Sequence, residues 1–231
     1  MSDFLYLDLE TIPSQDPVVH ERIAATITPP GTLKKPESIA EWEAEKKPAA
    51  VKEAIAKTSF DGAYGHICCI GWAVGGDEVV SDRITDVRDE ANMLGAFFEF
   101  SHRRIKGDNV FYSTPTIVGH NVVDFDIRFV WQRAIVLGVR VPAWFPRDPK
   151  PWGNETFDTM TAFAGARNRI SMDNLCRALG LPDKGEVDGS MVAGMWERGE
   201  HDAIAEYCRA DVERTRAIHR RMMIAFGQEA A

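Results

Sequence analysis

The fold of this chain is decided by its first apolar segment, Phe4 to Thr11, which reads FLYLDLET. Apolar residues occupy both faces of this extended segment and Pro13 follows it, a pattern typical of a buried central strand. Asp8 and Glu10 lie two residues apart in the strand, so their side chains project from the same face and can share a metal ion. The alternative is an exposed pair of acids at a strand end. The apolar surroundings favour cations or partners, because unpaired buried charge is costly.

Further elements follow from the hydrophobic pattern downstream. His66 to Val74 predicts a second buried strand, and Gly75, Gly76 and Asp77 then predict a turn into an antiparallel partner strand. The remaining predicted elements are the partner strand from Glu78 to Ile84, a helix from Arg88 to Lys106, a strand from Thr116 to Gly119, a helix reaching Leu137 and stopped by Gly138, a strand from Thr156 to Met160, and a last long helix from about Ala203 to Phe226. This order predicts an α/β fold with a mixed sheet of about five strands, one of them antiparallel, flanked by helices.

The stretch from about residue 14 to residue 64 differs in composition from the rest. It is rich in Pro, Lys and Glu, and its charge-rich part from Ser38 to Lys57 is predicted to be helical. We expect a single domain over residues 1–231 that carries this stretch as an insertion. Because its lysines and glutamates mostly cancel, a solvated helix is the main interpretation, and an arm that clamps substrate is the alternative.

Composition excludes several classes of protein. The chain has 231 residues, of which 45% are hydrophobic and 27% charged, which is ordinary for a folded domain and excludes intrinsic disorder. Its longest apolar stretch, Ile67 to Val74, is too short to cross a membrane, and no export signal opens the chain, so we expect a cytoplasmic protein without membrane contact. Cys68 and Cys69 are adjacent and would point to opposite faces of a strand, so we expect buried free thiols instead of a zinc site or disulfides.

The charge balance bears on nucleic-acid binding. With 27 basic and 35 acidic residues the net charge is −8, which argues against broad non-specific adhesion to nucleic acid. A nucleic-acid enzyme remains compatible with this charge, because an active site that collects carboxylates for cations is itself acidic.

A second group of acids occurs where a strand end runs into a helix start. The segment from Gly119 to Asp126 reads GHNVVDFD. Asp124 is a plausible N-cap of the following helix. Asp126 would then point from the first helical turn toward the carboxyl edge of the sheet, where ligands of open α/β sheets bind. Taken alone, the segment does not decide between these two acids.

The third group lies in the last helix. Tyr207 and Asp211 are four residues apart and therefore share a face, next to a core-facing stripe that includes Cys208 and Val212. An ordinary surface acid is the alternative interpretation for Asp211.

Together, the three segments resemble the three exonuclease motifs of the DEDD superfamily. Tyr207, ahead of Asp211, is typical of the DEDDy branch, and Glu206 stands where a DEDDh enzyme would carry His. The step from Asn121 to Asp126 is similar to that in the proofreading domain of family B DNA polymerases, and it selects Asp126 over Asp124. The segment from Lys184 to Ser190 also resembles stand-alone relatives of that domain. His120 stands where the polymerases often have Tyr, and its role is left unassigned.

This resemblance implies an RNase H-like (DnaQ-like) fold and a metal-dependent 3′–5′ exonuclease that shortens single-stranded DNA from its 3′ end. It implies two Mg²⁺ or Mn²⁺ ions, which suit oxygen ligands better than zinc does. The metal ligands implied are Asp8, Glu10, Asp126 and Asp211; Tyr207 would orient the attacking water, Thr11 and Asn121 would contact the terminal nucleotide, and Phe125 would pack on it. The alternatives are an exoribonuclease of the same fold and a non-catalytic nucleic-acid-binding module.

Overall fold

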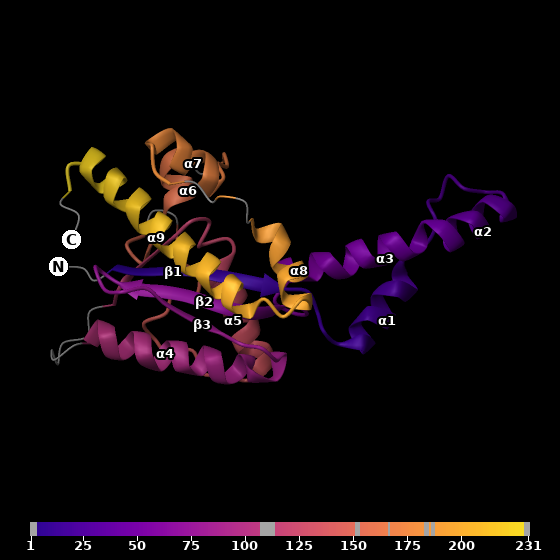
Figure 1. Ribbon diagram of the computed structural model, residues 1–231, viewed down its shortest axis with the longest axis horizontal. Coiled ribbons are helices and arrows are strands. Elements are labelled where there is room, and N and C mark those ends of the chain that lie inside the picture. Colours follow the sequence, from indigo (N-terminus) through magenta and orange to yellow (C-terminus); the bar gives the residue numbers. More distant parts are fainter. Residues whose placement is uncertain are drawn as a thin grey trace.

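The computed structural model describes residues 4–106, 114–150, 153–165, 167–182, 185 and 188–228. A five-stranded mixed sheet lies at its centre, between layers of helices (Figure 1). Its strands are β1 (Phe4–Ile12), β2 (His66–Val74), β3 (Val80–Arg83), β4 (Thr116–Gly119) and β5 (Thr156–Asp158), in the order β3-β2-β1-β4-β5. β2 pairs antiparallel with both β1 and β3, whereas β4 pairs parallel with β1 and β5. The predicted mixed sheet with one antiparallel strand is therefore confirmed.

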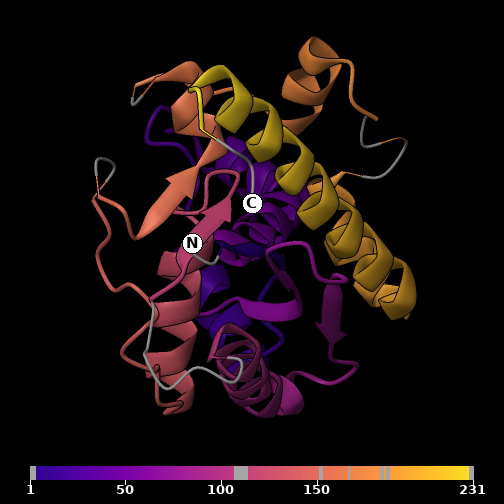
Figure 2. The same cartoon turned by 90° about the vertical axis from the view of Figure 1, so that its left-hand side faces the viewer.

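Three helices cover the two faces of the sheet. α4 (Glu90–Lys106) and α5 (Asp126–Leu137) lie on one face, and α9 (His201–Ala225) crosses the other (Figures 1 and 2). Alternate residues of β1 enter these two layers, because successive side chains of a strand point to opposite faces. Leu5 and Leu7 belong to the main core together with residues of α4 and α5, whereas Tyr6 clusters with Val212 of α9. Asp8 and Glu10 therefore project on the face that α9 covers.

The remaining body helices are short. They are η2 (Val87–Asp89), α6 (Thr159–Ala164), α7 (Met172–Leu179), η3 (Gly189–Met191) and α8 (Val192–Glu197). β5 ends at Asp158, two residues before the predicted end, because the Asp158 carboxylate accepts hydrogen bonds from the backbone N–H of Met160 and Thr161 and so begins α6. The N-cap prediction for Asp124 is wrong: α5 begins at Asp126, and its cap residue is Phe125. Gly138 ends α5 in the left-handed conformation, as predicted.

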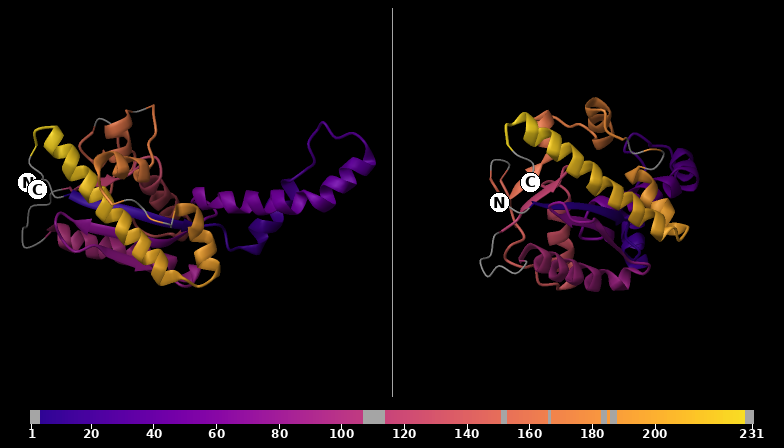
Figure 3. Two further views of the ribbon diagram at one scale, coloured as in Figure 1. Left: turned by 45° about the horizontal axis from the view of Figure 1, so that its top comes forward. Right: turned by 60° about the vertical axis from the view of Figure 1, so that its left-hand side comes forward.

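The chain between β1 and β2 forms a helical arm, defined here as residues 17–60. It contains α1 (Pro17–Thr26), α2 (Pro36–Glu45), α3 (Lys47–Ala56) and η1 (Lys57–Phe60). α2 and α3 extend away from the body (Figure 3). The structure describes every residue of these two helices, and none of them is buried. The helix expected from Ser38 to Lys57 is thus two helices, because α2 ends before Pro48, which occupies the first turn of α3. α1 was not predicted.

A buried ion pair fixes the end of the arm to the body. Glu90, which is fully buried, receives two hydrogen bonds of 2.7 Å from the Arg133 guanidinium and lies 2.9 Å from His66 Nδ1. Burial raises the pKa of Glu90, but the hydrogen bonds from His66 and Arg133 outweigh it and hold the pKa below its ordinary value. Arg133 also donates to the carbonyl of Gly62, 3.0 Å away. The segment that leads from the arm into β2 is therefore held by α4 and α5.

Two expectations from composition can be compared with the structure. The four cysteines all belong to the described residues, and they are buried and free, as predicted. Among the described helices, none combines the length and hydrophobicity that crossing a bilayer requires.

Candidate active site

Asp8 and Glu10 lie at the end of β1, next to an irregularity in the sheet. Glu10 pairs with Cys69 of β2, but Thr11 pairs with Ile67, so the register shifts between these two residues of β1. Such bulges re-aim side chains and are common beside active sites. Glu10 is buried and Asp8 half-buried, under α9.

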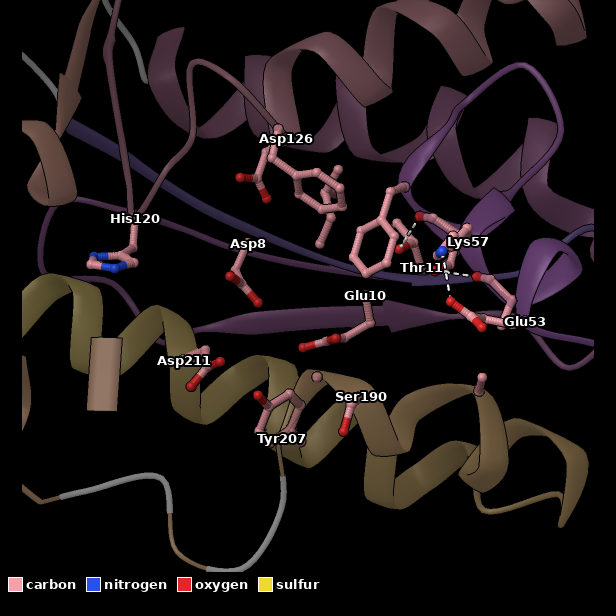
Figure 4. Close-up of a pocket in the computed structure, with 17 residues that line it drawn as sticks. Asp8, Glu10, Thr11, Glu53, Lys57, His120, Asp126, Ser190, Tyr207 and Asp211 are labelled. Carbon is pink, nitrogen blue, oxygen red and sulfur yellow. Dashed lines mark hydrogen bonds and ion pairs between the residues drawn. The ribbon is translucent and has the colours of Figure 1, made fainter. Parts of the chain in front are cut away.

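A glycine allows α9 to approach these two carboxylates. Gly71 of β2 pairs with Asp8, and a Cβ atom at this position would lie 2.8 Å from Cys208 Sγ and 2.9 Å from Val212 Cγ2. Any larger residue would push the helix away. The close approach brings Tyr207 and Asp211, one turn apart on α9, to the carboxylates of β1 (Figure 4).

Asp126 joins this group from the first turn of α5. Its side chain is 4% exposed. Burial and the neighbouring charge of Asp8 raise its pKa well above the ordinary value, and the charge of Asp158 adds to the shift. Asp126 is therefore a buried carboxyl close to the negative charge of Asp8.

The loop between β4 and α5 is shaped by Asp158, a residue that the sequence analysis missed. Its carboxylate accepts from the backbone N–H groups of Asn121 (3.0 Å) and Val123 (3.3 Å) as well as capping α6. Asn121 adopts a left-handed backbone with φ of 65°, which costs energy for a residue other than glycine. An acid at a strand end followed by Thr and Met is an N-cap signal, and this signal would have identified Asp158.

The acids face a common cavity of about 510 Å³. Of the eight predicted site residues, all except Asn121 line it; the Asn121 side-chain oxygen is buried and has no hydrogen-bond partner among the described residues. The lining residues that Figure 4 labels are Asp8, Glu10, Thr11, Glu53, Lys57, His120, Asp126, Ser190, Tyr207 and Asp211. The part of the arm nearest the body, residues 51–60, is called the arm root. It supplies Glu53, Lys57 and Phe60 to the cavity, and the sequence analysis assigned none of these three to the site.

Tyr207 is a proton donor in this environment. Burial, and then the charges of Asp211 and Glu10, raise its pKa far above the ordinary value, so the phenol keeps its proton. Asp211 is itself buried and accepts a hydrogen bond of 2.7 Å from Arg214 Nη1. This arrangement suits a phenol that orients a bound molecule by donating a hydrogen bond.

The donor atoms fit a hard divalent cation. Ligand atoms of Asp8, Glu10 and Cys208 all lie within 4.8 Å of one another. Cys208 belongs to this group only by position, because burial and its contact with Cys69 raise its pKa and keep the thiol protonated. Its sulfur lies 3.6 Å from Asp8 Oδ2, as a weak donor. The remaining ligands are carboxylate oxygens, which Mg²⁺ and Mn²⁺ prefer.

His120 lines the cavity, but both of its ring nitrogens are engaged with other groups of the protein. Its Nε2 lies 2.9 Å from the carbonyl of Ile170, and its Nδ1 lies 3.0 Å from Thr159 Oγ1. The ring therefore links the β4 end to α6 and to the segment before α7. In the segment from Lys184 to Ser190, Lys184, Glu186 and Val187 lie outside the described residues, while Gly189 and Ser190 line the cavity.

The fold and a comparison with protein families together define the class of protein. The mixed sheet carries acids toward the end of its first strand, an acid at the start of α5, and Tyr and Asp on the last helix. Residues 66–229 match the family described as a predicted 3′–5′ exonuclease related to the exonuclease domain of PolB, and the chain belongs to this family. β1 and the arm lie outside the matched residues.

One solved structure shows the same fold. The chain is similar to the family B DNA polymerase from the hyperthermophilic archaeon Pyrobaculum calidifontis, with a TM-score of 0.58 and 16% sequence identity. The similarity covers 98% of this chain and 25% of the polymerase chain, so this chain spans about a quarter of that protein. A search of curated protein sequences finds no match.

Proposed function

We propose that this chain is a metal-dependent 3′–5′ exonuclease that removes nucleotides from the 3′ end of single-stranded DNA. The observation that carries the proposal is the convergence of four carboxylates and a protonated tyrosine in one cavity, in a member of a family of predicted exonucleases. A module that only binds nucleic acid has no use for such a group, because carboxylates repel phosphate in the absence of cations.

Asp8, Glu10 and Asp211 would hold one divalent cation, and Asp8 with Asp126 would hold the second. When bound, two such ions lower the pKa of the attacking water and stabilise the leaving 3′ oxygen. Burial and the charge of Asp8 raise the pKa of Asp126, whereas a bound cation favours the charged carboxylate. Cation binding is therefore expected to release a proton and to weaken as the pH falls.

The side chains around the carboxylates would position the reactants. Tyr207 would donate its phenol proton in a hydrogen bond to the attacking water and align the water with the phosphorus atom. Thr11, whose hydroxyl donates to the carbonyl of Ser59, keeps its oxygen lone pairs for a donor on the terminal nucleotide. Phe125 lines the cavity and offers a surface on which a base of any sequence can stack. Asn121 would reach the nucleotide after a change of its side-chain rotamer, because its backbone N–H donates to Asp158 and its carbonyl accepts from Phe125.

The test is cleavage of single strands labelled at the 5′ end, DNA and RNA in parallel, with Mg²⁺, Mn²⁺ or EDTA. We expect a metal-dependent ladder that shortens from the 3′ end of DNA, that is lost in Asp8→Ala, and that slows by about 10² to 10³ in Tyr207→Phe, the loss typical of a single positioning donor. Asp124→Ala is the matched control, because Asp124 is an exposed acid outside the cavity. Faster cleavage of RNA would make the protein an exoribonuclease, and strands that bind but stay intact would make it a binding module.

A further inference from the structure

A second cavity adjoins the active-site cavity. It has a volume of about 500 Å³ and is lined by residues of the arm, of the segment before it and of α8; the ribbon diagram shows α8 next to the body end of α3 (Figure 1). Ala56 of α3 and Ala193 of α8 line both cavities, so the two cavities adjoin at these residues. We call the two adjoining cavities together the groove; the carboxylates line the first of them.

The walls of this groove combine cations with apolar and aromatic surface. Lys57, at the start of η1, lines the first cavity, and Lys52 of α3 lines the second. Phe60, 73% exposed, lines the first cavity, 6.4 Å from Phe125 between ring centroids, and Trp196 lines the second. Stacking surfaces alternating with positive charge are the features with which proteins hold single strands of any sequence.

The lysine in the first cavity can change partner. Lys57 Nζ lies 2.7 Å from Glu53 Oε1, but both side chains are about two-thirds exposed, at 69% and 68%. An exposed pair of this kind contributes little stability. A phosphate can therefore replace Glu53 as the partner of Lys57 at small cost.

We propose that the second cavity binds the nucleotides that precede the 3′-terminal one, so that the strand runs past Ala56 and Ala193 to the carboxylates. The inference rests on the proposed function, and it assigns the arm root a role in holding the strand. A cavity of about 510 Å³ accommodates a ligand the size of one nucleotide, so the next nucleotides require further surface, and the adjoining cavity lies next to the first. Most of this surface belongs to α3 and the segment before α1, which lie outside the residues matched by the family.

The experiment compares substrates of different length. The p-nitrophenyl ester of thymidine 5′-monophosphate occupies only the terminal subsite, whereas oligothymidylates of increasing length extend into the groove. For the wild-type protein we expect kcat/KM to rise from the ester to the oligonucleotides through a falling KM. The readout for each variant is the ratio of oligonucleotide to ester kcat/KM, which separates the groove from the catalytic centre.

Two variants test the second cavity. Lys52→Glu should lower the ratio about fivefold, as expected for loss of one partly exposed ion pair, and should reduce the slope of log KM against log salt by roughly 0.7, the value for one phosphate contact of a single strand. Val51→Trp, which fills the cavity from an exposed helix, should remove the dependence on length. Their matched controls are Lys34→Glu and Val18→Trp, at positions that line neither cavity.

The outcomes separate the two proposals. Failure of the wild-type protein to hydrolyse either substrate with Mg²⁺ or Mn²⁺ would overturn the proposed function and this inference with it. Hydrolysis of both substrates with ratios in Lys52→Glu and Val51→Trp equal to those of the controls would overturn the inference alone, and would leave the cavity to another occupant.

Discussion

Replacing Asp8 by Asn should stabilise the protein in the absence of metal and abolish its activity. The change removes one negative charge from the cavity and keeps the shape of the side chain. Ligand atoms of Asp8 and Glu10 lie within 4.8 Å of each other, and the charge of Asp8 contributes to the raised pKa of Asp126. Two unit charges at this distance repel by about 3.5 kcal/mol at an effective dielectric constant of about 20. The contact of Arg214 with Asp211 relieves part of the repulsion within this group of acids.

We therefore expect the free energy of unfolding in EDTA to rise by about 1 to 2 kcal/mol, which corresponds to an increase in Tm of about 3 to 6 °C for a chain of this length. Mg²⁺ should reverse the order. A ligand at a hundredfold excess over its Kd stabilises the folded state by about 2.7 kcal/mol, and the variant lacks a central ligand. The assay is thermal unfolding of both proteins in EDTA and in Mg²⁺, beside cleavage of labelled DNA.

Asp124→Asn provides the control for removal of one charge, because Asp124 is exposed and lies outside the cavity. Its Tm should match that of the wild-type protein under both conditions. An Asp8→Asn protein that unfolds at a lower temperature than the wild-type protein in EDTA would refute the reasoning. Asp8 would then be a structural residue, held by its contact with Cys208. Repulsion among the acids would then not destabilise the protein in the absence of a cation.

Three further predictions follow from the packing. Gly71→Ala should displace α9 and lower the free energy of unfolding by about 1 to 3 kcal/mol. Because Tyr207 and Asp211 would then be misplaced, cleavage should slow on the order of 10²-fold. The control is Gly95→Ala, where the added methyl group meets no described atom within 4 Å, and an unchanged cleavage rate in Gly71→Ala would contradict the role of the glycine. Arg133→Leu should lower the free energy of unfolding, measured in urea, by about 3 to 5 kcal/mol, because it leaves the charge of Glu90 buried without its guanidinium partner. Adding Glu90→Gln to the same chain should restore part of the lost stability. A double variant that is no more stable than Arg133→Leu would count against this cause. Burial lowers the pKa of His219 to about 4, below the value of about 6.5 in the unfolded chain, so the unfolded state binds the proton first and the free energy of unfolding should fall as the pH drops from about 6.5 to 4. An equal slope in His219→Gln, whose amide can still accept from Tyr6, would exclude His219 as the source.

Much of the sheet could be predicted because its information is local. β1 and β2 are apolar on both faces, and this pattern is specific to strands that are buried on both sides. The grouping of Asp8, Glu10, Asp126 and Asp211 could also be predicted, but only through the order and spacing of the three motifs. Taken singly, each of these acids had an ordinary structural interpretation.

The parts that could not be predicted depend on contacts between distant segments. Asp124 carries a good N-cap side chain, yet the backbone of this loop is set by hydrogen bonds to Asp158, from more than thirty positions later in the chain, and α5 starts two residues further on. Phe60 and Lys57 reach the cavity because the arm returns to the end of β1. No periodicity or motif within residues 17–60 encodes that return.

The arm root and the carboxylates are positioned by the same strand end. Thr11, the residue after Glu10, donates its hydroxyl to the carbonyl of Ser59, 2.8 Å away, and the N–H of Ser14 donates to Thr58 Oγ1, also over 2.8 Å. Because these bonds join the end of β1 to η1 immediately beyond the acids, the wall that carries Lys57 and Phe60 keeps a fixed distance from the carboxylates. α2, in contrast, has no buried residue among those described. We therefore expect any contact of the arm with a nucleic-acid strand to lie at its root, and the length of α2 is free of this constraint.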